Sequence, residues 1–149
     1  MLRTSGLNAH SLGSVTGPTH RVLSETEVLA RLRNKRGQPG YLAMFSSWLG
    51  GVVTDPALMQ IPLDDHLVHR GHGVFDTCTL SGGRLYRLGI HIDRLLTSAS
   101  LARIEHSWTK EDLIQMVMDT ASHAGITDGA VRYWLSAGPG GFSPSPQEC

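Results

Sequence analysis

The sequence has 149 residues, enough for one domain with a hydrophobic core and too few for two domains of ordinary size. Thirteen basic and thirteen acidic side chains cancel, so the charge does not favour a nucleic acid or a membrane surface as the main partner. No apolar run approaches the roughly 20 residues of a membrane-spanning helix. The two cysteines, Cys78 and Cys149, do not suggest a disulfide framework and favour a reducing compartment.

Residues 1–21 contain no Asp or Glu and are rich in Ser and Thr. This composition is typical of an organellar transit peptide, and it fits a flexible N-terminal tail equally well. We therefore expect residues 1–23 to lie outside the folded domain. A transit peptide would direct the protein to a plastid or a mitochondrion, and without one the protein would be cytoplasmic.

A helix and a hairpin are predicted first along the chain. The string Ser24-Glu25-Thr26-Glu27 is a capping-box pattern, which predicts a helix that starts near Glu25. Residues 41–48 are rich in aromatic and apolar side chains and predict a strand. Gly50-Gly51 predicts a turn into a second strand at residues 52–54.

A second hairpin is predicted after an irregular segment. Residues 61–66 are expected to be irregular, because the proline at position 62 favours an extended conformation in the residue before it. Residues 74–80 alternate in polarity and predict a strand. Gly82-Gly83 then predicts a turn into residues 84–86.

Two helices and a strand are predicted after this hairpin. The first helix is marked by an apolar stripe at helical spacing, formed by Ile92, Leu95, Leu96 and Ala99. Thr109, with Asp112 three positions on, marks the start of the second helix, and Gly125 is placed to end it. Residues 130–137 predict the strand. The order of elements predicts an α+β fold, with a mainly antiparallel sheet and helices on one face.

Three evenly spaced histidines, His66, His69 and His72, raise a metal-binding module as one hypothesis. Such a spacing brings ligands together on a helix, and Gly71 and Gly73 argue against a helix here. No zinc-type motif accompanies the histidines. We favour the interpretation that these histidines order a loop or lie exposed, without a metal.

Arg94 lies opposite the apolar stripe on a helical wheel, so the pattern alone predicts an arginine that faces water. Its surroundings also carry a resemblance. Residues 70–77, RGHGVFDT, and residues 91–95, HIDRL, resemble the N-terminal half of a class IV (fold type IV) pyridoxal-phosphate-dependent aminotransferase. The resemblance is closest to the plant-type branch similar to D-amino-acid transaminases, with branched-chain aminotransferases as further relatives.

The resemblance covers roughly residues 41–146 and implies the small N-terminal domain of that fold. We expect this domain at residues 24–142, followed by the start of an interdomain linker at 143–149. The resemblance implies a homodimer that uses pyridoxal 5'-phosphate. Amino acids and 2-oxo acids would be its substrates, and neither a nucleic acid nor a membrane is implied as a partner.

The resemblance also implies roles for four side chains. Arg94 would bind the phosphate of the cofactor, since a guanidinium is a planar, permanently charged fork. Phe75 and Asp76 would line the substrate pocket. Arg132 would bind the distal carboxylate of glutamate or 2-oxoglutarate, with an ion pair to a surface carboxylate as the alternative. The Arg-x-His motif that binds the substrate carboxylate in bacterial D-amino-acid transaminases is absent near residues 142–146.

No catalytic residue is expected in this chain, because the family's Schiff-base lysine has no match. The two lysines are Lys35, in a basic loop, and Lys110, in a turn that follows a helix cap. We therefore expect a truncated chain, inactive alone, of an enzyme that moves an amino group from an amino acid, including D-amino acids, to a 2-oxo acid. The alternatives are an aminodeoxychorismate lyase-type enzyme on the same fold and a non-catalytic paralogue that dimerises with a full-length partner.

Overall fold

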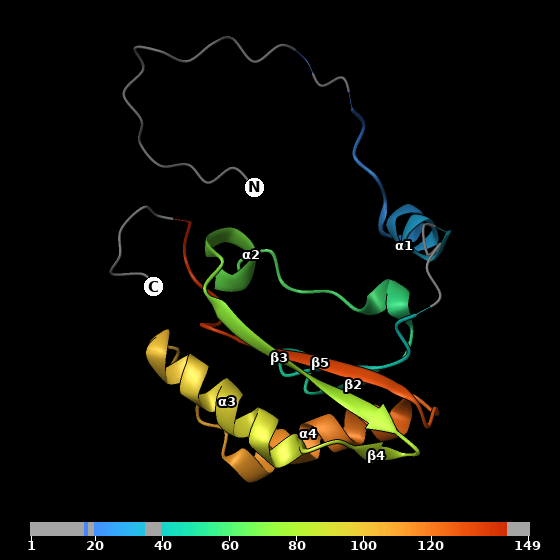
Figure 1. Cartoon of the computed structure of the whole chain (residues 1–149). Helices are drawn as coiled ribbons and strands as arrows, with labels where there is room; N and C mark the ends of the chain where they lie inside the picture. Colours follow the sequence, from blue (N-terminus) through green and yellow to red (C-terminus); the bar gives the residue numbers. More distant parts are fainter. Residues whose placement is uncertain (1–16, 18–19, 35–39, 143–149) are drawn as a thin grey trace.

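The computed structural model describes residues 17, 20–34 and 40–142 (Figure 1). Most of the expected tail, 1–23, and all of the expected linker, 143–149, lie outside these residues. The mixture of helices and antiparallel sheet confirms the predicted α+β class. In chain order the elements are α1 (Glu25–Asn34), β1 (Met44–Ser46), β2 (Gly51–Val53), the short 3-10 helix η1 (Pro56–Leu58), α2 (His66–Arg70), β3 (Gly73–Ser81), β4 (Arg84–Leu85), α3 (Leu88–Leu101), α4 (Lys110–His123) and β5 (Gly129–Ser136).

Strand β3 is the centre of a three-stranded antiparallel sheet with the order β4-β3-β5. Strand β5 pairs with it from Gly73, opposite Ser136, to Leu80, opposite Gly129. A Gly82-Gly83 turn leads to β4, and both glycines have a positive φ, 54° and 74°, which residues with a side chain rarely adopt. The second predicted hairpin is therefore confirmed.

Helices α3 and α4 lie together on one side of the sheet (Figure 1). The predicted apolar stripe of α3 faces inward, with Ile92, Leu95 and Ala99 buried. No helix within the described residues is long and apolar enough to cross a bilayer. The core between the sheet and the two helices consists of Cys78, Leu88, Ile92, Leu113 and Val117.

Both predicted capping boxes are present. The N–H of Glu27 donates to Ser24 Oγ, and the N–H of Ser24 donates in return to the Glu27 carboxylate. Thr109 and Asp112 exchange the same two bonds at the start of α4. Helices α1 and α4 therefore start where predicted, because these side chains satisfy backbone groups that the first helical turn leaves free.

The β1–β2 hairpin is shorter than predicted. Only residues 44–46 of the expected strand 41–48 pair with residues 51–53, and residues 47–50 form the turn between them. The hairpin packs against α4. Trp48, which had been included in the strand, lies in this turn and is exposed.

Residues 61–65 lie outside the helices and strands, as expected, but the expectation that no helix forms around the three histidines is wrong. Residues His66–Arg70 form the short helix α2. Asp65 caps its start by accepting a hydrogen bond from the N–H of Leu67, and Gly71 ends it with a φ of 66°. The glycine that argued against a helix is the residue that terminates it.

Helix α2 is tied to the segment that follows β5. The N–H of His66 donates to the carbonyl of Gly138 at 2.9 Å, and the N–H of Gly140 donates to the carbonyl of Asp64 at 2.9 Å. The His66 imidazole is 2% exposed and packs directly on the backbone of Gly140. These contacts fix α2 over one end of the sheet.

Replacing Gly140 with alanine should destabilise the fold by about 1–3 kcal/mol, the usual cost of overpacking a filled site. The added methyl group would overlap the imidazole of His66, which is buried and has no free space to enter. The free energy of unfolding is measured by urea denaturation followed by circular dichroism.

Gly89→Ala is the matched control for this substitution. An added Cβ there meets only Lys110 Cε, at 4.0 Å, and lies within α3, so stability should stay unchanged or rise. Equal unfolding midpoints for Gly140→Ala and the wild type would contradict the packing of His66 on Gly140.

Candidate functional site

The two faces of β3 carry different chemistry, because successive residues of a strand point to opposite sides of the sheet. Asp76 is buried on the side of α3, whereas Phe75 is exposed on the other side. Directly opposed residues of antiparallel strands lie on the same face of the sheet. Trp134 of β5 therefore shares a face with Phe75, and Arg132 shares a face with Thr77. Two separate groups of side chains result.

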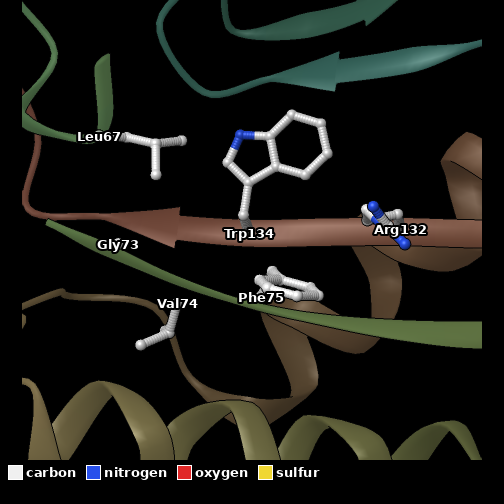
Figure 2. A pocket seen from close by; sticks show the side chains of 6 residues that line it. All are labelled: Leu67, Gly73, Val74, Phe75, Arg132 and Trp134. Atoms are coloured by element: carbon white, nitrogen blue, oxygen red, sulfur yellow. The ribbon is translucent and has the colours of Figure 1, made fainter. Parts of the chain in front are cut away.

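A shallow pocket of about 190 Å³ lies beside the first group (Figure 2). Phe75 is 66% exposed and Trp134 is 42% exposed, so aromatic surface is open at this place. Complete ligand pockets usually enclose about 300–1,000 Å³, so this pocket is smaller than an ordinary ligand site. The lining residues are Leu67 from α2, Gly73, Val74 and Phe75 from β3, and Arg132 and Trp134 from β5.

Arg132 supplies the positive charge of this pocket. Its guanidinium lies 5.3 Å from the centre of the Phe75 ring, and its Nε donates to Thr77 Oγ1 at 3.3 Å. No carboxylate of the described residues forms an ion pair with it, so the alternative of a surface ion pair finds no partner in this part of the chain. The two terminal nitrogens of Arg132 are available to a ligand.

The second group, which we call the Asp76 cluster, consists of Asp76, His91 and Arg94. Arg94 Nε lies 3.3 Å from Asp76 Oδ2, an ion-pair distance without the alignment of a hydrogen bond. His91 Nδ1 lies 3.3 Å from Asp76 Oδ1. The N–H of Thr77 also donates to Oδ1, at 2.7 Å. One carboxylate of β3 thus holds two side chains of α3.

Arg94 itself reaches into solvent. Its side chain is 67% exposed, although the carboxylate of Asp76 is only 7% exposed. The helical-wheel prediction of an arginine away from the core is confirmed. Because the side chain is mostly exposed, its guanidinium is accessible to an anion, and its predicted contact with a phosphate stays a prediction.

The expectation that Asp76 lines the substrate pocket beside Phe75 does not fit this geometry. The two residues are neighbours in one strand, so their side chains lie on opposite faces of the sheet. Phe75 and Arg132 are brought together by the structure, and so are Asp76 and Arg94. The two pairs are separated by the backbone of β3.

Asp76 also affects two neighbours in the core. Burial raises the pKa of the Cys78 thiol, and the negative charge of Asp76 raises it further. Burial likewise raises the pKa of the Tyr133 phenol, with Asp76 and Cys78 adding to the rise and Arg94 opposing it. The Tyr133 hydroxyl is buried without a hydrogen-bond partner. Both groups therefore stay neutral at pH 7.

The three histidines do not direct their nitrogens to one point. His69 Nε2 contacts the carbonyl of Asp64 at 3.3 Å, and His72 Nε2 contacts the carbonyl of Ala102 at 2.8 Å. Both ring nitrogens of His66 are buried without a partner. Across residues 20–34 and 40–142, no group of three His, Cys, Asp or Glu side chains could hold a metal ion.

Lys110, the one lysine among the described residues, does not line the pocket. Lys110 Nζ lies 2.6 Å from Asp93 Oδ1, in an ion pair between α4 and α3. The prediction that Lys110 lies in a turn is wrong, because it is the first residue of α4. Lys35 falls outside the described residues.

Sequence reasoning missed three residues of the candidate site. His91 stands three positions before Arg94 and therefore lies on the same helix face, a spacing that could have indicated it. Trp134 could have been found from the alternation of residues 130–137, which places it on the face of Arg132. Leu67 carried no sequence signal, because its contact with the sheet depends on the position of α2.

Comparisons with known proteins point to one family. The family model for class IV amino-transferases matches residues 73–149. The chloroplastic D-amino-acid transaminase of Arabidopsis thaliana is 52% identical over 128 residues, which cover 86% of this chain and 34% of that protein. The chain spans about a third of the length of the curated relatives it matches.

Solved structures share the fold. A branched-chain amino acid aminotransferase from Escherichia coli matches with a TM-score of 0.58 and 22% identity, over 65% of this chain and 33% of that one. A putative 4-amino-4-deoxychorismate lyase from Legionella pneumophila matches with a TM-score of 0.55 and 20% identity, over 62% and 34%. Another branched-chain amino acid aminotransferase, solved with pyridoxamine 5'-phosphate, matches with a TM-score of 0.52 and 21% identity, over 57% and 29%. The fold of a fold type IV N-terminal domain is confirmed.

Raising the pH above about 10 should destabilise the wild-type chain more steeply than a Tyr133→Phe variant. A phenol whose pKa is higher in the folded than in the unfolded state contributes stability below its unfolded pKa and loses it as the pH rises. Tyr133 is such a phenol, and phenylalanine has no proton to lose. The difference is measured as urea midpoints near pH 9, 10 and 11.

Cys78 is present in both proteins, so the comparison measures the loss of the Tyr133 phenol together with its interaction with Cys78. Parallel pH profiles of the wild type and Tyr133→Phe would contradict the burial of the phenol.

Proposed function

Because the chain belongs to the class IV aminotransferase family, we propose that it is the part of a pyridoxal-phosphate-dependent aminotransferase that binds the cofactor phosphate and lines the substrate pocket. The enzyme transfers an amino group from an amino acid to a 2-oxo acid. The similarity to a plant D-amino-acid transaminase favours D-amino acids as donors. The domain occupies residues 24–142, and residues 143–149 begin the linker to the rest of the enzyme.

The Asp76 cluster is the observation that carries this proposal. Arg94 is mostly exposed, yet its Nε is held 3.3 Å from a buried carboxylate. An arginine fixed at one nitrogen loses less conformational freedom when its terminal nitrogens bind a phosphate. Asp76 therefore acts by positioning Arg94, and it does not touch the substrate.

The pocket on the other face fits the substrate. Arg132 has terminal nitrogens available beside an exposed aromatic ring, which suits a carboxylate attached to a short carbon chain. Thr77 restricts the guanidinium through its hydrogen bond to Nε. Arg132 binds the distal carboxylate of a dicarboxylic substrate such as glutamate or 2-oxoglutarate, and Phe75 contacts its carbon chain.

Pyridoxal phosphate, when bound, supplies the electron sink that lets the amino group move, and a lysine must hold it and transfer a proton. The residues described here fit the phosphate of this cofactor through Arg94. They do not fit its aldehyde, because Lys110 is engaged by Asp93. The lysine therefore comes from a part of the enzyme beyond residues 20–34 and 40–142.

A lyase that acts on aminodeoxychorismate is the second candidate. The Legionella lyase matches the fold about as well as the E. coli aminotransferase does, with TM-scores of 0.55 and 0.58. Activity assays distinguish the two candidates. They use the protein expressed from the full reading frame that contains this chain, which we call the full-frame protein. It should convert D-alanine and 2-oxoglutarate and leave aminodeoxychorismate unchanged.

We place this protein in the plastid, because its relative from Arabidopsis thaliana is chloroplastic, and expect a homodimer.

Arg94→Ala in this full-frame protein should weaken the binding of pyridoxal phosphate about tenfold or more, the usual effect of losing a charge-assisted hydrogen bond. Phosphate-free pyridoxal should bind the variant and the wild type equally, because Arg94 contacts only the phosphate. Binding is measured by titrating the apoenzyme and following cofactor absorbance.

Two further variants sharpen this test. Arg84→Ala removes an exposed arginine of β4 outside the Asp76 cluster and should leave both affinities unchanged. Asp76→Asn should weaken binding of pyridoxal phosphate less than Arg94→Ala does, because the guanidinium remains but is no longer held. An equal loss for pyridoxal and pyridoxal phosphate in Arg94→Ala would rule out the phosphate role.

The chain of 149 residues, purified alone and mixed with pyridoxal phosphate, should show no transamination and no visible absorption from lysine-bound cofactor. The reason is that no lysine among the described residues lines the pocket. Activity, or an absorption band that disappears on borohydride reduction, would contradict this expectation. The full-frame protein serves as the positive control.

A further inference from the structure

Trp134 lies on the exposed face of the sheet and is not part of the hydrophobic core. It stands directly opposite Phe75 in the register of β3 and β5 and is 42% exposed. The core of the domain lies on the other face, between the sheet and helices α3 and α4. A large aromatic pair left half open to water is typical of a binding surface.

Leu67 closes the pocket at the end away from Arg132. Figure 2 shows its side chain beside the Trp134 indole, above the strands. It approaches β3 closely, because a Cβ on Gly73 would lie 2.6 Å from Leu67 Cδ1. The glycine at position 73 therefore allows the leucine to reach the floor of the pocket. The pocket has a cation at one end and an aliphatic group at the other.

This end wall is held firmly, although α2 is only five residues long. Asp65 caps the helix at the N–H of Leu67, and the second oxygen of the same carboxylate accepts a hydrogen bond from Ser136 Oγ at 2.9 Å. The N–H of Ala137 donates to the carbonyl of His72 at 3.1 Å. Leu67 is thus fixed relative to β5, the strand that carries Trp134.

We propose that Trp134 determines which substrate side chains the pocket accepts, with Leu67 as the end wall. The indole and the leucine occupy the space into which a long or branched apolar side chain would extend. Small apolar side chains fit against Phe75 and Trp134, while a dicarboxylic substrate directs its distal carboxylate to Arg132. This proposal rests on the proposed aminotransferase function and specifies its substrate class.

Trp134→Ala in the full-frame protein tests the proposal. The ratio of kcat/KM for phenylalanine to kcat/KM for alanine, both as the enantiomer that the wild type accepts, should rise about tenfold or more. A change of a few carbon atoms in an apolar pocket typically alters specificity by roughly 10–200-fold. Trp48→Ala, which removes an exposed tryptophan of the β1–β2 turn, is the matched control and should leave the ratio unchanged.

The outcomes separate the two proposals. If Trp134→Ala transaminates with the wild-type ratio of kcat/KM for phenylalanine to kcat/KM for alanine, the role of Trp134 is overturned. The proposed function is then unaffected. A loss of activity for both donors without a change in their ratio overturns the role of Trp134 as well.

If the full-frame protein does not transaminate at all, the proposed function fails, and the pocket is tested directly. A Trp48→Phe, Trp108→Phe variant leaves Trp134 as the single tryptophan of this chain, and 2-oxoglutarate is the probe. A saturable change in indole emission that disappears when Arg132→Ala is added supports a ligand beside Trp134. Emission that does not respond to the probe overturns the inference.

Discussion

Both groups of candidate side chains are placed by strand β3, whose successive residues point to opposite faces of the sheet. Its backbone separates a buried carboxylate on one face from an exposed aromatic ring on the other, and the two belong to adjacent residues, Asp76 and Phe75. A shift of the strand by one residue would exchange the two faces and destroy both groups at once. The long register with β5 and the Gly82-Gly83 turn prevent such a shift. Strand pairing therefore fixes the Asp76 cluster and the pocket beside Phe75 relative to each other.

A charged cluster beside a small core has an energetic cost. Removing the Asp76 carboxylate from water is unfavourable, and it is tolerated only because Arg94, His91 and the N–H of Thr77 surround it. Apolar residues of similar size would fill the same space with no desolvation cost.

The elements with strong local signals could be predicted from the sequence. Capping boxes at Ser24 and Thr109 and the apolar stripe of α3 describe interactions within a few residues, and the structure contains all of them. Helix α2 is not predicted, although Asp65 and Gly71 are ordinary start and stop residues, because glycines at positions 71 and 73 also indicate a loop. The resemblance indicated which residues to examine but not the direction in which Asp76 points. The contact between Leu67 and the sheet joins distant parts of the chain and has no local pattern.

The open aromatic face of β3 and β5 has a consequence for handling the protein. Phe75 and Trp134 offer water a flat apolar surface, which a folded domain normally covers. The chain has no net charge at neutral pH, so electrostatic repulsion between molecules is weak. We therefore expect the isolated chain to self-associate through this face at high concentration.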